Sequence, residues 1–211
     1  DPLHSDTLLN ACLMEQVVGT LVKRGFDGTP EPFLAESWNV STDNKKFEFL
    51  IRANAICEDG TYITAKRFKY NLIRLIRSYL ANNKSLPMFE KLIGFEQFER
   101  GESAEVEGLQ SDNEVLRFIF EEKPEGVFAF LSMPYYGFFS DSNFDSSGAW
   151  KNSAAIISSG IWRLKRNDET SIILERRVGW WGEEFKNAPD LVEVKMMDFS
   201  EAKKEKPENT I

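Results

Sequence analysis

Histidine and cysteine are scarce in this sequence, which has one histidine and two cysteines among 211 residues. A structural zinc site needs about four ligands, which are most often cysteine and histidine. A nucleophile relay of the Ser-His-Asp kind needs a histidine between its two partners, but His4 lies near the start of the sequence. The composition therefore argues against a zinc centre and against such a relay, and we expect neither a metal nor another cofactor.

An excess of positive charge is also lacking. Lysine and arginine number 26 against 34 aspartates and glutamates, which gives a net charge of −8 and a pI near 4.9. Without a dominant cationic surface, neither nucleic acid nor an anionic membrane is expected as a partner. No apolar run approaches the roughly 18 residues of a membrane-spanning helix. The sequence starts at Asp1 in a polar segment without a signal peptide, and we expect it to be a trimmed part of a longer protein.

The two cysteines, Cys12 and Cys57, permit either one disulfide or two free thiols. Cys12 is surrounded in sequence by leucines and valine, which is typical of a buried position. A free cysteine often behaves simply as a small buried apolar residue. The sequence leaves both possibilities open.

Aromatic residues are plentiful, with 17 phenylalanines, and 42% of the residues are hydrophobic, which is sufficient for a core. The most informative stretch is 34–75. Within it, Phe47, Phe49 and Ile51 alternate with more polar residues, the period of two that predicts a strand with one buried face. Turns of Asp, Asn and Gly residues precede and follow this strand at 42–44 and 58–60.

A helix is predicted directly after the second turn. Thr64 occupies the position of an N-cap, whose hydroxyl accepts a hydrogen bond from the first turn of a helix. The apolar residues that follow recur at helical spacing and predict one buried face: Phe68, Leu72, Leu75 and Ile76. This stretch is a strand, turn and helix scaffold and contains no catalytic chemistry.

The remaining chain also alternates between predicted strands and helices. Apolar spacing predicts helices over 9–21, 89–100 and 127–133, and period-two alternation predicts strands over 115–121 and 192–196. Hairpins are predicted at Asp27-Gly28 and at Asn167-Asp168. The aromatic cluster 134–139 is interpreted as a core strand or, alternatively, as a set of rings that line a cleft.

Several motifs occur in an order that resembles a known family. These are LAESW at 34–38, T-x-x-T-A at 61–65, Ser-Ser-Gly-Ile-Trp at 158–162 and Gly-Trp-Trp-Gly at 179–182. Their succession resembles the extracytoplasmic solute-binding proteins of family 5, the oligopeptide-, dipeptide- and nickel-binding components of ABC transporters. The sequence departs from the family pattern at Val18-Gly19, at Ile161 and at Arg177-Val178.

The resemblance implies a fold and a division into domains. The fold class is α/β (mixed α+β), the first lobe of a periplasmic-binding-protein-like fold of type II, with a small sheet domain inserted in it. Residues 1–20 and 150–199 are expected to form domain I of this lobe and residues 21–149 the inserted domain. Residues 200–211, which are charged and nearly without apolar side chains, are expected to form a tail or a crossover to a second lobe.

The resemblance also implies a function. It predicts an extracytoplasmic protein, periplasmic or anchored as a lipoprotein, that is monomeric, is not an enzyme and delivers a short peptide or similar small solute to the permease of an ABC transporter. The expected ligand contacts are the backbone of Asp6, Thr7 and Leu8, which is suited to pair with an extended ligand. The aromatic residues Tyr135, Tyr136 and Trp162 are expected to lie near the same ligand. Affinity in this family comes from enclosure between two lobes, so this chain alone is expected to bind weakly or not at all.

Two other functions remain open from the sequence. The same fold serves as a sensor domain in regulatory proteins, and the departures from the family pattern fit such divergence. The 34 acidic residues and five tryptophans also permit a carbohydrate hydrolase. Such an enzyme needs two carboxyl groups at a defined separation in a cleft, and no acidic residue here has the apolar sequence neighbours expected of a raised pKa.

Overall fold

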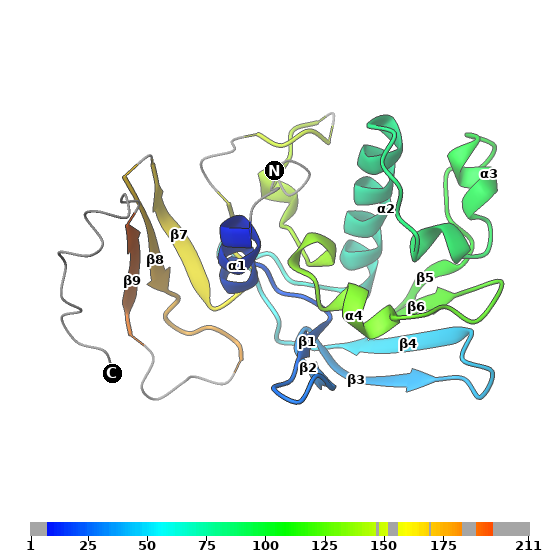
Figure 1. The fold of residues 1–211 in the computed structure, drawn as a ribbon, viewed down its shortest axis with the longest axis horizontal. Coiled ribbons are helices and arrows are strands. Elements are labelled where there is room, and N and C mark those ends of the chain that lie inside the picture. Colours follow the sequence, from blue (N-terminus) through cyan, green and yellow to red (C-terminus); the bar gives the residue numbers. More distant parts are fainter. Residues whose placement is uncertain (1–7, 147, 152–155, 169, 183–188, 196–211) are drawn as a thin grey trace.

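The computed structural model describes residues 8–146, 148–151, 156–168, 170–182 and 189–195. Two sheets lie at opposite ends of the molecule, with the helix α1 (Leu8–Val17) between them (Figure 1). The predicted mixed α/β class is confirmed, because helices and antiparallel sheets alternate along the chain. None of the helices in the described ranges is long and apolar enough to span a membrane.

The larger sheet is antiparallel, with the strand order β3-β4-β6-β5. Its strands are β3 (Ala35–Val40), β4 (Lys46–Ile51), β5 (Leu109–Asp112) and β6 (Val115–Ile119). The predicted alternation is confirmed in β4, where Phe47, Phe49 and Ile51 are buried. The helix α2 (Ala65–Ala81) packs against β5 and β6 and covers the sheet with its apolar face. These contacts place the scaffold of residues 34–75 at the centre of the largest core.

The predicted start of α2 is confirmed in detail. The Thr64 hydroxyl accepts a hydrogen bond from the backbone N–H of Arg67 at 3.3 Å, so it satisfies one of the donors that a helix leaves free in its first turn. The four predicted stripe residues are all buried in the core. Before the helix, Gly60 adopts a positive φ of 80°, a conformation that suits the predicted turn.

One predicted helix is wrong. Instead of a single helix over 89–100, the chain forms a 3₁₀ turn, η2 (Phe89–Lys91), and a short helix, α3 (Phe95–Glu99). Gly94 lies between them in the left-handed region with φ of 75°, which interrupts the helical backbone. The apolar periodicity was nevertheless informative, because Phe89, Phe95 and Phe98 are all buried.

The rest of this half of the chain consists of short elements. A small hairpin pairs β1 (Val22–Arg24) with β2 (Pro30–Pro32), as the Asp27-Gly28 turn predicts. The helix predicted over 9–21 ends at Val17, and that over 127–133 is α4 (Val127–Leu131). Residues 134–139 are buried except for the half-buried Tyr135, as the first interpretation largely predicts, but they begin with a 3₁₀ turn, η3 (Pro134–Tyr136), rather than a strand.

The smaller sheet has the order β7-β8-β9 and is antiparallel. The hairpin predicted at Asn167-Asp168 is confirmed by β7 (Trp162–Asn167) and β8 (Ser171–Arg176), and β9 (Leu191–Lys195) matches the last predicted strand. This sheet and α1 share a second hydrophobic cluster that includes Val17, Val18, Phe139 and Trp162. The buried residues of the first cluster lie within 21–138. The protein therefore has two cores along one chain.

A short segment, 158–160, lies where the two cores meet. The Ser159 hydroxyl accepts from the N–H of Gly19 at 2.7 Å and donates to the carbonyl of Phe138 at 2.6 Å. A side chain at Gly160 would place a Cβ 2.6 Å from the carbonyl oxygen of Gln16, so only glycine permits this close approach of two backbones. The glycine of the 158–162 motif thus has a packing role.

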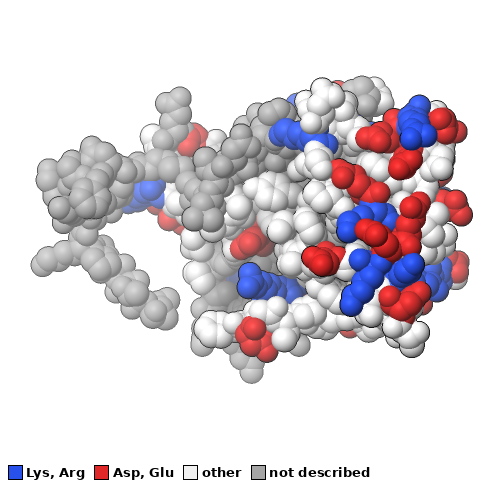
Figure 2. All heavy atoms as spheres, turned by 45° about the vertical axis from the view of Figure 1, so that its right-hand side comes forward, with Lys and Arg blue, Asp and Glu red and all other residues white. Residues whose placement is uncertain are grey.

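Charges are mixed on the face around α3 and the larger sheet. Figure 2 shows cationic and anionic side chains interspersed there, without a continuous patch of either sign. Glu48 forms ion pairs with both Lys46 and Arg117 at 2.9 and 2.7 Å, and Arg100 pairs with Glu96 at 3.1 Å. This face therefore lacks the uniform positive potential that attracts nucleic acid.

Candidate functional site

The backbone segment predicted to contact the ligand falls mostly outside the described residues. Asp6 and Thr7 are not described. Leu8 is the first residue of α1, and its side chain is not described. The prediction for Asp6 to Leu8 therefore stays a prediction.

The two predicted tyrosines lie in η3 and differ in exposure. Tyr136 is 8% exposed and packs in the first core against Phe89 and Phe130, with ring centroids 5.6 and 6.0 Å apart. Burial, with a contribution from Tyr79, raises the pKa of the Tyr136 hydroxyl to about 12. Tyr135 is only half-buried. Tyr135 therefore offers more surface to a ligand than Tyr136 does.

Trp162 lies in the other core. It is 8% exposed, begins β7, and its carbonyl accepts a short hydrogen bond from the Ser158 hydroxyl. The structure thus places Tyr136 and Trp162 in separate hydrophobic clusters and does not bring them together. A ligand contact by either ring remains a prediction, but both have a clear packing role.

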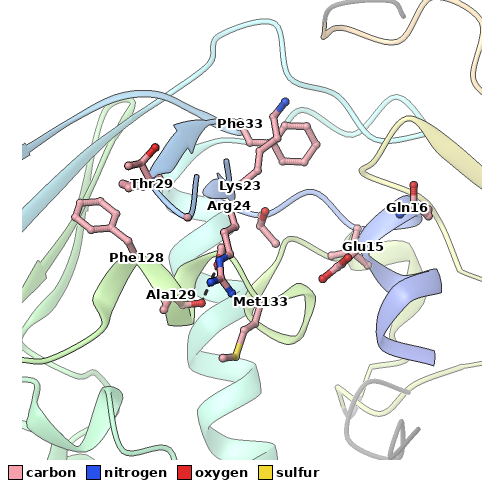
Figure 3. A pocket seen from close by; sticks show the side chains of 14 residues that line it. Glu15, Gln16, Lys23, Arg24, Thr29, Phe33, Phe128, Ala129 and Met133 are labelled. Atoms are coloured by element: carbon pink, nitrogen blue, oxygen red, sulfur yellow. Dashed lines mark hydrogen bonds between the residues drawn. The ribbon is translucent and has the colours of Figure 1, made fainter. Parts of the chain in front are cut away.

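A pocket of about 560 Å³ lies between the C-terminal end of α1, the β1–β2 hairpin and α4 (Figure 3). None of the predicted ligand contacts that the structure describes lines it. The lining comprises Glu15, Gln16, Val18, Thr20, Lys23, Arg24, Gly28, Thr29, Pro30, Phe33, Phe128, Ala129, Ser132 and Met133. The Asp27-Gly28 signal predicted the hairpin that forms one wall of this pocket, but not the pocket itself, because the other two walls come from residues that are distant in sequence.

The walls of this pocket carry opposite charges. Glu15 comes from α1, whereas Lys23 and Arg24 come from β1, and Arg24 points toward Ala129 in α4 (Figure 3). The Lys23 ammonium lies 5.5 Å from the ring centroid of Phe33, a cation-π distance. Together with its apolar lining, this arrangement is suited to hold a small molecule that has both an apolar part and charged ends.

The thiols do not form a reactive centre. Cys12 and Cys57 are both free. The expectation that Cys12 is buried is wrong, because its side chain is exposed, whereas Cys57 is buried. Burial and the nearby Asp59 raise the pKa of the Cys57 thiol to about 12, so it is protonated at neutral pH and is a poor nucleophile. Within the described ranges, no three His, Cys, Asp or Glu side chains are grouped so that they could hold a metal ion.

Asp59 links the turn before α2 to the segment that follows the first core. Its carboxylate accepts hydrogen bonds from the N–H of Thr61 at 3.0 Å and from the hydroxyl of Ser140 at 2.7 Å. Burial alone would raise the pKa of Asp59, but hydrogen bonds from Ser142, Ser140 and Thr61 outweigh it and lower the pKa to about 2. The ionised form is therefore the one that the fold stabilises.

We expect Asp59→Asn to lower the free energy of unfolding at pH 7 by about 1 kcal/mol, after discounting for solvent screening. Because the pKa in the folded state lies below the value of 3.8 for a free aspartate, the stabilisation is complete above about pH 4 and disappears as the pH falls toward 2. Urea unfolding at several pH values measures the difference between wild type and variant. That difference should shrink between pH 4 and 2, and a constant difference would contradict the prediction. Glu102→Gln, at an exposed loop residue, is the matched control and should leave the curve unchanged.

A sequence model described as "Bacterial extracellular solute-binding proteins, family 5 Middle" matches residues 29–206. Among curated proteins, the Dipeptide-binding protein DppE of Bacillus subtilis (strain 168) is 27% identical over 173 residues. That match covers 80% of this chain and 32% of the relative, so the chain spans about a third of the relative's length.

Solved structures with the same fold include two oligopeptide-binding proteins. A periplasmic oligopeptide-binding protein of an ABC transporter, OppAIV from Borrelia burgdorferi, superposes with a TM-score of 0.77 at 19% identity. OppA of Listeria monocytogenes bound to peptide superposes with a TM-score of 0.75 at 16% identity. Each match covers 93% of this chain and 40% of the other chain. At these identities the likeness shows the fold, and this chain corresponds to less than half of either structure.

Proposed function

Because this chain belongs to family 5 of the bacterial extracellular solute-binding proteins, we propose that it is the first lobe of a peptide-binding component of an ABC-type importer. The observation that carries the proposal is the family match over residues 29–206, most of the chain. The fold shared with a peptide-bound OppA supports it. A regulatory sensor is not favoured, because the relatives named above are peptide-binding and transporter proteins.

The domain division belongs to the same proposal. Residues 1–20 and 150–199 form one domain, residues 21–149 form an inserted one, and 200–211 lead toward a second lobe. The two hydrophobic clusters support this division in outline, because the first lies within 21–138 and the second combines α1 with the β7–β9 sheet. Phe139 and Phe144, from the end of the inserted domain, also belong to the second cluster. The lobe would work outside the cytoplasm, as a monomer, and would pass its ligand to a membrane permease without chemical change.

For the ligand we propose a short peptide in extended conformation. Its backbone would pair with Asp6, Thr7 and Leu8, a contact that requires no particular side chain. The half-buried Tyr135 would contact the same peptide. Tyr136 and Trp162, which are buried in the two cores, would support the surface that the peptide contacts. The name of the Bacillus relative and the peptide in the Listeria structure support peptides over other small solutes.

Calorimetry on the intact protein and on residues 1–211 tests this proposal. We expect di- to hexapeptides to bind the intact protein with micromolar or tighter affinity and residues 1–211 at least a hundredfold more weakly, because one lobe leaves most of the ligand in water. Circular dichroism of residues 1–211 would confirm that the lobe is folded. Micromolar binding by residues 1–211 would contradict the expected enclosure, and the absence of peptide binding by the intact protein would overturn the proposed function.

A further inference from the structure

Arg74, in the middle of α2, lies against a stack of aromatic rings. Its guanidinium carbon is 3.6 Å from the ring centroid of Phe144. Phe144 in turn packs edge-to-face against Trp150 with centroids 5.1 Å apart, and Trp150 packs against Phe139 at 5.5 Å. The Asn71 side chain, one turn away in sequence, donates to the carbonyl of Phe139 at 3.0 Å and holds this segment beside α2. The arginine therefore has a fixed aromatic surface beneath it.

Arg74 has no ion pair or hydrogen bond with any residue that the structure describes. Its Nε atom is buried and has no hydrogen-bond partner, and no carboxylate in the described part of the chain forms an ion pair with it. Asp141 interacts with it only electrostatically. Burial lowers the pKa of Arg74 to about 10, which still leaves the guanidinium protonated at neutral pH.

Other arginines of this protein, the exposed Arg77 and the half-buried Arg117 and Arg177, have polar partners. Arg77, one turn further along α2, donates to the carbonyl of Ala104 at 3.1 Å. Arg117 pairs with Glu48 at 2.7 Å, and Arg177 donates to three backbone carbonyls. In half-buried Arg74 the nitrogen that is buried without a partner is Nε. Burying an N–H donor without a hydrogen bond is unfavourable, and stacking on an aromatic ring offsets only part of that cost. Arg74 is therefore in the state expected of a residue whose partner arrives from outside the described lobe.

The chemistry of the missing partner follows from the guanidinium. Its planar set of N–H donors fits a carboxylate through two parallel hydrogen bonds, and this geometry is stronger and more selective than a contact with a neutral group. Tyr70, one turn earlier on the same face of α2, is 61% exposed. A solvent-exposed ring therefore lies next to Arg74 on α2.

We propose that Arg74, stacked on Phe144, binds a carboxylate of the peptide ligand. This inference rests on the proposed function and assigns α2 and residues 139–146 and 148–151 to the ligand-facing surface. The carboxylate is either the C-terminus of the peptide or an acidic side chain. The two sources present the same group, and the experiment separates them.

Calorimetry on the intact protein compares two pairs of peptides. The first pair is trialanine and trialanine amide, which differ in the C-terminal carboxylate. The second pair is Ala-Glu-Ala and Ala-Gln-Ala, which differ in the side-chain carboxylate. In wild type we expect one member of a pair, the one with the additional carboxylate, to bind roughly ten- to a hundredfold more tightly. A preference in the first pair identifies the C-terminus, and a preference in the second identifies a side chain. Arg74→Gln should abolish that preference, and Arg74→Lys, which keeps the charge but not the planar donors, should retain part of it.

Arg77→Gln is the matched control, because it removes a cation from the same helix that already has a backbone partner. It should preserve the preference for the carboxylate. Thermal unfolding of each variant confirms that it is folded. If Arg74→Gln does not fold, the reduced preference of Arg74→Lys for the carboxylate tests the inference instead.

Four results would overturn the inference. Equal weakening of both members of each pair by Arg74→Gln would assign Arg74 a structural role only. A preference that survives Arg74→Gln but is lost in Lys23→Ala/Arg24→Ala would place the ligand in the pocket beside β1. If wild type binds both members of each pair equally, no carboxylate is recognised and only this inference fails, whereas wild type that binds none of the peptides removes the proposed function as well.

Discussion

Phe49→Ala is expected to lower the free energy of unfolding by about 3–5 kcal/mol. Phe49 is fully buried at the centre of β4. Its ring meets Phe118 edge-to-face at 5.8 Å and also contacts Trp38 and Phe128, with centroids 6.5 and 6.1 Å away. Truncation removes the contacts of a large ring and leaves a cavity that the paired strands on either side prevent from closing. Urea denaturation followed by circular dichroism measures the change.

Phe26→Ala is the matched control for this prediction. Phe26 is the same residue type, but its side chain is fully exposed in the turn between β1 and β2. Its replacement should change the free energy of unfolding by no more than about 0.5 kcal/mol. Comparable losses for the two variants would show that the larger sheet does not form the core described above.

Arg177→Met should lower the free energy of unfolding by about 3 kcal/mol. The Arg177 guanidinium donates to the carbonyls of Gly160 at 2.8 Å, Ile56 at 3.0 Å and Ser158 at 3.3 Å. These hydrogen bonds connect the loop before α2, at Ile56, to the segment 158–160, where the two cores meet. Methionine keeps most of the apolar stem, so the loss isolates the hydrogen bonds rather than the packing. Guanidinium chloride titration with tryptophan fluorescence measures it.

Arg100→Met serves as the control for Arg177. The side chains of Arg100 and of its partner Glu96 are both largely exposed, and such surface pairs contribute about 0–1 kcal/mol. A loss below about 1 kcal/mol for Arg177→Met would mean that water replaces the guanidinium at the three carbonyls.

Local structure followed well from local sequence. The alternation in β4, the Thr64 cap, the stripe of α2 and the hairpins at Asp27-Gly28 and Asn167-Asp168 are all present. Each depends on residues a few positions apart, and their periodicity, side-chain capping and turn geometry act over that range. The helix predicted over 89–100 failed because apolar spacing alone did not reveal that Gly94 adopts a left-handed conformation.

The candidate sites were predicted much less well. Arg74 and Phe144 are 70 positions apart, and the pocket combines α1, β1 and α4. Periodicity gives no information on which elements meet, so neither arrangement was visible in the sequence. Tyr136 and Trp162 were selected as aromatic residues near conspicuous motifs, yet most of their surface is used in two different cores. An aromatic side chain has the same sequence signature in a core and in a cleft.

The sequence by itself determined the family, the mixed α/β class, the absence of an apolar span and most of the secondary structure. These properties depend on composition, on local periodicity and on the order of short motifs. Only the folded structure shows that the chain has two cores joined at 158–160, that hydrogen bonds from Arg177 hold this junction, and that Nε of Arg74 is buried without a hydrogen-bond partner. Burial and pairing are properties of contacts between distant segments, and they exist only once the chain is folded.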